Sequence, residues 1–119
     1  MKTATAKRPM ARVSVRDSVE ILKNIRNKPV KKAKSLLNDL IDQKRSLDGK
    51  YYTGASKEIL ELIEQSERNA ESQGLDTEKL FIKEAKADKG LRFFLPKSRW
   101  SHRGKRAKIC QLAITLEER

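Results

Sequence analysis

Apolar residues recur at helical spacing in three stretches of the chain, and each stretch predicts an amphipathic helix. The first stripe is formed by Val19, Leu22 and Ile25. Asp17 and Glu20, three residues apart, resemble a capping box at its start. The second stripe is Val30, Ala33, Leu37, Leu40 and Ile41, and the third is Ile59, Leu60, Leu62, Ile63, Ser66 and Ala70.

Proline, glycine and serine residues stand where these predicted helices should begin or end. Pro29 suits the opening of the second helix, where a missing N–H costs little. Gly54 and Ser56 mark the start of the third, after a polar loop over residues 43–53. Gly74 suits its C-terminal cap, where a positive φ is needed.

Alternating positions predict three short strands. Residues 11–15 form the first, with Val13 and Val15 on one face, and residues 80–87 form the second. Residues 109–116 form the third, and one of its faces carries Cys110, Leu112, Ile114 and Leu116. Residues 1–9 have no such pattern, so we expect them to be a disordered basic arm.

The last two strands are joined by residues 89–108, a long basic stretch with little core-type periodicity. The expected fold class is therefore α+β: three helices packed on a small antiparallel three-stranded sheet, with a long protruding β-hairpin. We expect a basic N-terminal arm over residues 1–10 and a single domain over 11–119, with the extended hairpin at about 89–108.

Charge is distributed unevenly in this 119-residue chain, whose formal net charge is +12. Residues 1–16, 21–38 and 89–108 contain basic residues and no acid, whereas residues 58–88 hold nine acids and four bases. A charge of this size repels itself in a free compact protein, and nucleic acid is the usual polyanion that compensates it. An anionic membrane is the competing partner, but the chain has no convincing basic amphipathic helix that carries Trp and Leu.

Residue types suited to catalysis or metal binding are scarce in this sequence. The one histidine, His102, and the one cysteine, Cys110, cannot form a zinc site alone, and there is no phosphate-cradling GxxxxGK[ST] or GxGxxG motif. We therefore expect no catalytic residue, no metal and no cofactor. A single cysteine fits a reducing compartment, and residues 1–17 lack an apolar run suited to a signal peptide, so the expected location is the cytoplasm.

The most informative stretch for function is 89–108, where aromatic residues alternate with bases. Phe93, Phe94, Trp100 and His102 could stack on unpaired bases, while the surrounding Lys and Arg neutralise phosphates. A solvated loop with locally packed aromatics is the simpler alternative, and composition alone cannot separate RNA from DNA. The acidic third helix should face solvent, or else dock a basic partner.

Three segments bring a resemblance to a known family. RVSVRDSVEILKNIRNKPVKKAKSLL, NAESQGLDTEKLFIKEAKADKG and RFFLPKSRWSHRGKRAKICQLAITL resemble, in this order, segments of the universal large-subunit ribosomal protein twenty-two family. This family is numbered seventeen in the older eukaryotic naming. Trp100 stands where the family usually has glycine, and Gln111 and Leu112 replace a His-Ile pair. Residues 43–53 look like a shortened form of the archaeal and eukaryotic insertion, which favours that branch.

The resemblance implies a structural constituent of the large ribosomal subunit that is not an enzyme. Its partners would be large-subunit ribosomal RNA (rRNA), neighbouring ribosomal proteins and the nascent polypeptide, with no membrane. The hairpin would line the peptide exit tunnel, and its tip would comprise Lys97, Ser98, Arg99, Trp100 and Ser101. The main alternative is a free nucleic-acid-binding or RNA-chaperone module outside the ribosome.

The expected rRNA-binding residues come from the three acid-free stretches. They are Lys7, Arg8, Arg12, Arg16, Arg26, Lys28, Lys31, Lys32, Lys34, Lys89, Arg92, Lys97, Arg99, Trp100, His102, Arg103, Lys105, Arg106 and Lys108.

Overall fold

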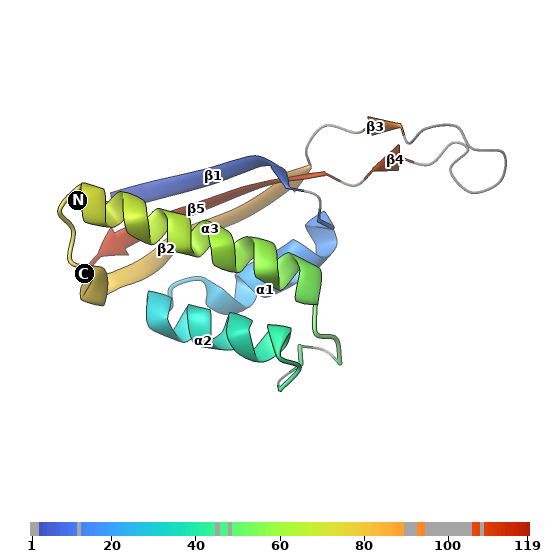
Figure 1. Cartoon of the computed structure of the whole chain (residues 1–119), viewed down its shortest axis with the longest axis horizontal. Coiled ribbons are helices and arrows are strands. Elements are labelled where there is room, and N and C mark those ends of the chain that lie inside the picture. Colours follow the sequence, from blue (N-terminus) through green and yellow to red (C-terminus); the bar gives the residue numbers. More distant parts are fainter. Residues whose placement is uncertain are drawn as a thin grey trace, which may run out of the picture.

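Three helices and a three-stranded sheet make up the body of the protein (Figure 1). The computed structural model describes residues 3–11, 13–44, 46–47, 49–89, 93–94, 106–107 and 109–119. The elements follow in the order β1 (Thr3–Ala11), α1 (Val15–Ile25), α2 (Val30–Ile41), α3 (Thr53–Ser72), the 3-10 turn η1 (Thr77–Lys79), β2 (Leu80–Lys89), β3 (Phe93–Phe94), β4 (Arg106–Ala107) and β5 (Cys110–Glu118).

The last strand occupies the centre of the sheet, whose order is β1-β5-β2 with both pairings antiparallel. Ile114 of β5 lies opposite Ala6 of β1 on one side and Ala85 of β2 on the other. The predicted alternation of β5 is confirmed, because Cys110, Leu112, Ile114 and Leu116 are buried while Gln111 is exposed. One face of the sheet therefore supplies the core.

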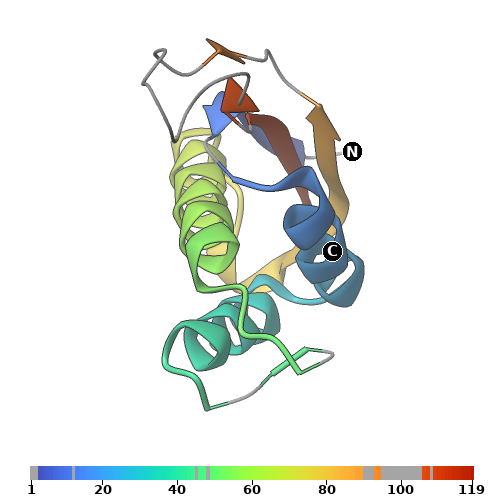
Figure 2. The same cartoon turned by 90° about the vertical axis from the view of Figure 1, so that its right-hand side faces the viewer.

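The helices cover that one face. Helix α3 packs on β1 and β5, α1 packs on β2, and α2 packs on α3. Figure 2 shows α3 and α1 side by side beneath the sheet, with α2 farthest from it. The predicted α+β fold, with three helices on a small antiparallel sheet, is confirmed.

The N-terminal prediction was wrong in two respects. Residues 3–9, expected to be disordered, belong to β1, and the strand ends at Ala11 instead of starting there. The inward positions of β1 are Ala4 and Ala6, which are buried under α3. Alanine is a poor strand former, so strand character comes from pairing with β5 and not from local preference.

Helix boundaries also differ from expectation in places. Helix α1 begins at Val15 after Ser14, so Asp17 lies in its first turn and does not cap it. Its buried stripe contains Ser18, Ile21, Leu22 and Ile25, whereas Val19 is only half-buried. In the later helices Ile41 and Leu60 are half-buried too, and the remaining predicted stripe positions are buried. Pro29 immediately precedes α2, and Gly74 follows α3 with φ +78°, both as predicted.

The hairpin prediction is tested only at two points. Phe93 lies opposite Ala107, and Phe94 lies opposite Arg106, in an antiparallel pair formed by β3 and β4. Ala11 and Lys89 both align with Cys110, so β1 ends, β2 ends and β5 begins at the same end of the sheet. The predicted tip, residues 97–101, lies outside the described residues.

Candidate nucleic-acid interface

The basic turn between α1 and α2 lies along the outer edge of β2. The Asn27 N–H donates to the carbonyl of Ile82 over 2.8 Å, and the Ile82 N–H donates to the carbonyl of Lys28 over 3.0 Å. Pro29 forms a further β-bridge with Phe81. The turn thus pairs with β2 like a short additional strand, which fixes its backbone on the sheet.

Arg26 extends this docking with its side chain. Its Nε and Nη2 atoms donate to the carbonyl oxygen of Ala85 over 3.0 and 2.8 Å. A bulge lies between Ile82 and Glu84, just before this contact. The guanidinium that the sequence assigned to RNA is therefore hydrogen-bonded to the protein's own backbone.

Of the four lysines around this turn, two point to solvent without a partner and two pair with acids. Lys28 and Lys32 are exposed, and neither forms an ion pair with a carboxylate of the described residues. Lys31 contacts Glu78 over 3.2 Å at an exposed site. Lys34 contacts Glu67 of α3 over 2.9 Å, and both side chains are largely covered.

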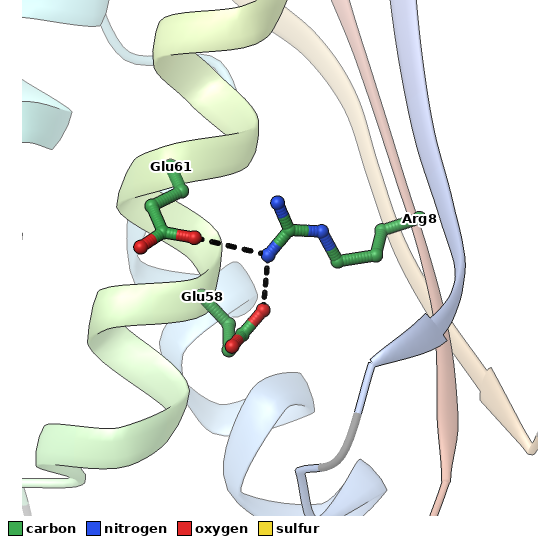
Figure 3. A network of polar contacts seen from close by, with 3 residues as sticks. All are labelled: Arg8, Glu58 and Glu61. Atoms are coloured by element: carbon green, nitrogen blue, oxygen red, sulfur yellow. Dashed lines mark hydrogen bonds and ion pairs between the residues drawn. The ribbon is translucent and has the colours of Figure 1, made fainter.

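Arg8 is also neutralised within the protein. Figure 3 shows its guanidinium reaching from β1 to two acids of α3, Glu58 and Glu61. Nη1 donates to both carboxylates, and the contact to Glu61 measures 3.2 Å. The pKa of Arg8 is raised, chiefly by the hydrogen bond to Glu58, against a smaller opposing effect of desolvation.

These pairs correct the expectation for α3. Its acidic stripe was predicted to face solvent, which is wrong for Glu58 and Glu67, whose side chains are 33% and 23% exposed. The acid-free stretches of sequence supply the cations that neutralise this helix. Sequence reasoning treated each stretch as a surface by itself and so missed the long-range pairing, which joins residues 50 and 33 positions apart.

Three further predicted residues remain exposed and unpaired within the described part of the chain. Lys7 lies on β1 between buried Ala6 and half-buried Arg8, so its side chain is on the sheet face that no helix covers. Together with Lys86 it borders a shallow hollow on that face. Arg16 is exposed in the first turn of α1, and Lys89 is exposed at the end of β2.

The remaining predicted residues lie outside what the structure describes. Only the backbone pairing of Arg106 is described. The others are Arg12, Arg92, Lys97, Ser98, Arg99, Trp100, Ser101, His102, Arg103, Lys105 and Lys108.

Sequence reasoning also missed cations near the loop between α2 and α3. Lys44, Lys50 and Lys57 are exposed and unpaired among the described residues. Acidic residues lie between and beside them in the sequence, so they do not form an acid-free stretch. Lys44 follows the end of α2, Lys50 lies in the loop between the helices, and Lys57 lies near the start of α3.

Groups suited to catalysis or metal binding are sparse here. Among the described residues, no cluster of three or more His, Cys, Asp or Glu could hold a metal ion. Cys110 is fully buried, and burial raises the pKa of its thiol, which disfavours the reactive thiolate. No helix in the described ranges has the length and apolar character that a membrane span requires.

Comparison with known proteins relates the chain to ribosomal proteins of one family. The sequence profile described as ribosomal protein L22p/L17e matches residues 6–117. The chain is 33% identical to the "Large ribosomal subunit protein uL22" of Archaeoglobus fulgidus in an alignment of 97 positions, gaps included, which covers 66% of the chain and 63% of that relative.

Two further archaeal proteins of the same printed name show similar agreement. The Methanocella arvoryzae protein is 35% identical in an alignment of 109 positions, gaps included, which covers 73% of the chain and 71% of the relative. The Methanopyrus kandleri protein is 29% identical in an alignment of 140 positions, which covers 99% of the chain and 88% of the relative. The chain thus spans less than two thirds of the first of these relatives and most of the last.

Proposed function

The chain belongs to the ribosomal protein L22p/L17e family, and from this membership we propose that it is a structural constituent of the large ribosomal subunit that binds rRNA. The observation that carries the proposal is the set of exposed cations without a carboxylate partner among the described residues. Among the residues that the sequence assigned to RNA, they are Lys7, Arg16, Lys28, Lys32 and Lys89. Such side chains can release counterions from a phosphate backbone without first breaking an ion pair.

Besides Lys7 on the outer face of the sheet, the proposed interface has two parts. Lys89 and Arg16 lie where β2 ends and α1 begins, and the proposed hairpin would continue the chain from the end of β2. Lys28 lies on the turn that pairs with the first residues of β2, and Lys32 lies in the first turn of α2. Cations near both ends of β2 allow one protein to contact two separate RNA segments, and this supports a role in linking rRNA domains during assembly.

The finer roles follow from the family resemblance. We propose that residues 89–108 form the extended hairpin that lines the exit tunnel, with residues 97–101 near the nascent polypeptide. Neighbouring ribosomal proteins would be further partners, and the location would be the cytoplasm, within the ribosome. We also propose that the chain forms a single domain, into which residues 3–9, first expected to belong to a basic arm, are incorporated as part of β1.

We propose that the protein has no catalytic activity. Binding by phosphate contacts needs only positioned cations, whereas catalysis needs convergent reactive groups. Conversion of an RNA substrate by the purified protein, lost on substitution of a single acid, would contradict this.

The direct test is co-sedimentation with the large subunit. Epitope-tagged protein expressed in the source organism should migrate with large subunits through a sucrose gradient after a high-salt wash. A protein embedded in the subunit is retained because all of its contacts must break together before it dissociates. Recovery only at the top of the gradient would refute the proposal. It would favour instead a free RNA-binding or chaperone module, whose affinity falls steeply with salt.

A further inference from the structure

Arg26 is an exposed residue in the basic turn, yet its side chain is directed to the protein's own backbone. Two guanidinium nitrogens, Nε and Nη2, both donate to the carbonyl oxygen of Ala85. No carboxylate of the described residues pairs with it. The N–H groups of a surface arginine ordinarily donate to water or to an anion, so this contact with the backbone indicates a structural role for Arg26.

The contact has a geometric consequence for the turn. Backbone hydrogen bonds attach Asn27 and Lys28 to Ile82, and Pro29 forms a β-bridge with Phe81. Arg26 adds a second attachment three residues farther along β2, beyond the bulge at Ile82 and Glu84. Attachments on both sides of the bulge restrain the turn more than the backbone pairing at Ile82 and Phe81 does alone.

The two unpaired lysines lie directly after this double attachment. Lys28 and Lys32 line one groove beside the first turns of α2, and Asp39 lines the same groove. The neighbouring Lys31 and Lys34 pair with Glu78 and Glu67, so of the four lysines around this turn Lys28 and Lys32 are left for a ligand. Asp39 is the negative charge that a phosphate entering this groove would meet.

We propose that Arg26 is a positioning residue that holds Lys28 and Lys32 in place as a phosphate-binding pair for RNA. This inference rests on the proposed rRNA binding. It departs from the sequence-based interpretation in which Arg26 itself contacts RNA. A fixed pair binds the backbone with less loss of side-chain and loop entropy than a mobile one.

A double-mutant cycle separates positioning from direct contact. The full chain is titrated with transcribed large-subunit rRNA, comparing wild type, Arg26→Gln, the double variant Lys28→Gln/Lys32→Gln, and the triple variant. Arg26→Gln should weaken binding by about twofold or more, the lower end of coupling within one contact network. In the triple variant that effect should vanish, because the lysines through which Arg26 acts are gone.

Two matched variants complete the test. Lys34→Gln removes one charge from the same helix but from a lysine already paired with Glu67, and it should leave affinity unchanged. Asp39→Asn should strengthen binding, by removing like-charge repulsion at the groove. Equilibrium unfolding of each variant verifies that all are folded at the titration temperature.

The outcomes separate cleanly. An equal loss for Arg26→Gln in both backgrounds would mean that Arg26 contacts phosphate directly, which overturns the inference and leaves rRNA binding intact. No loss for Arg26→Gln alone would also overturn it. Failure of the wild-type protein to bind rRNA would overturn the proposed function, and the inference with it.

Discussion

Replacement of Arg8 by methionine should destabilise the protein through the loss of one bridge between β1 and α3. Arg8 donates to Glu58 and Glu61, and these contacts tie the N-terminal strand to the long helix. Methionine keeps an unbranched aliphatic side chain of similar length but removes the charge and all donors. The two carboxylates would then face each other without a cation.

The size of the effect follows from exposure. The Arg8 and Glu58 side chains are 31% and 33% exposed, whereas Glu61 is 61% exposed. Exposed ion pairs contribute about 0.2–1 kcal/mol, and better-covered charged hydrogen bonds contribute more. We therefore expect a loss of about 1 kcal/mol, mostly through Glu58, which lowers the Tm of a chain this long by roughly 4 °C.

The pH dependence of this stabilisation has a definite sign. The pKa of Arg8 is raised in the folded protein, so its contribution is fully present below the arginine pKa of the unfolded chain. It is lost only as pH rises through the still higher folded value. Arg8 therefore stays charged throughout the neutral pH range. The difference in the free energy of unfolding between wild type and Arg8→Met should not change there through titration of Arg8.

Urea unfolding measures the effect, with Lys7→Met as the matched control. Lys7 is the adjacent residue of β1, carries the same charge and pairs with no described carboxylate. The Arg8→Met loss should exceed the Lys7→Met loss, and a cycle with Glu58→Gln should give a coupling of about 1 kcal/mol that weakens in high salt. Equal losses for the two variants, with no coupling, would refute the bridge.

Three further substitutions and one chemical treatment have definite expected outcomes. Leu112→Ala should cost about 2–5 kcal/mol in urea unfolding, because this side chain is 2% exposed in the core, and a loss below 1 kcal/mol would contradict its placement. Gly74→Ala should destabilise the protein by about 1 kcal/mol, because Gly74 has a φ of +78°. Gly54→Ala should stabilise it by about 0.5–1 kcal/mol, because Gly54 lies in the first turn of α3, where alanine is the better helix former. Thermal melts that show the same sign for both variants would contradict these backbone assignments. Cys110 should resist alkylation at neutral pH in the folded protein and react once the chain is unfolded, because burial raises its thiol pKa; rapid modification under native conditions would show that the strand end is open.

Strong periodic patterns made most of the fold predictable. Leu37, Leu62 and Leu112 belong to stripes or alternations whose burial the structure confirms. Strand β1 could not be predicted, because Ala4 and Ala6 are too small to produce a hydrophobic alternation. Their small size suits the face that α3 covers, and this packing is a property of the assembled sheet.

The candidate interface was predictable as a set of basic stretches but not residue by residue. Charge counting treats Arg8, Lys28 and Lys34 alike, since each lies in a stretch without acids. Their difference arises from distant residues: Glu58 lies opposite Arg8, Glu67 lies opposite Lys34, and no described acid lies opposite Lys28. Ion pairs between elements far apart in sequence have no local signature.

The salt dependence of rRNA binding tests most directly whether the unpaired cations form the interface. Two variants that lose the same charge are compared, Lys7→Gln/Lys89→Gln and Arg8→Gln/Lys34→Gln, and the slope of log K against log salt concentration is measured for each. Each lost phosphate contact should reduce the slope by roughly 0.7–0.9. The first variant should therefore lose up to roughly 1.4–1.8 of slope and the second almost none. Equal reductions in both would mean that net charge alone governs binding, in contradiction to an interface formed by the unpaired cations.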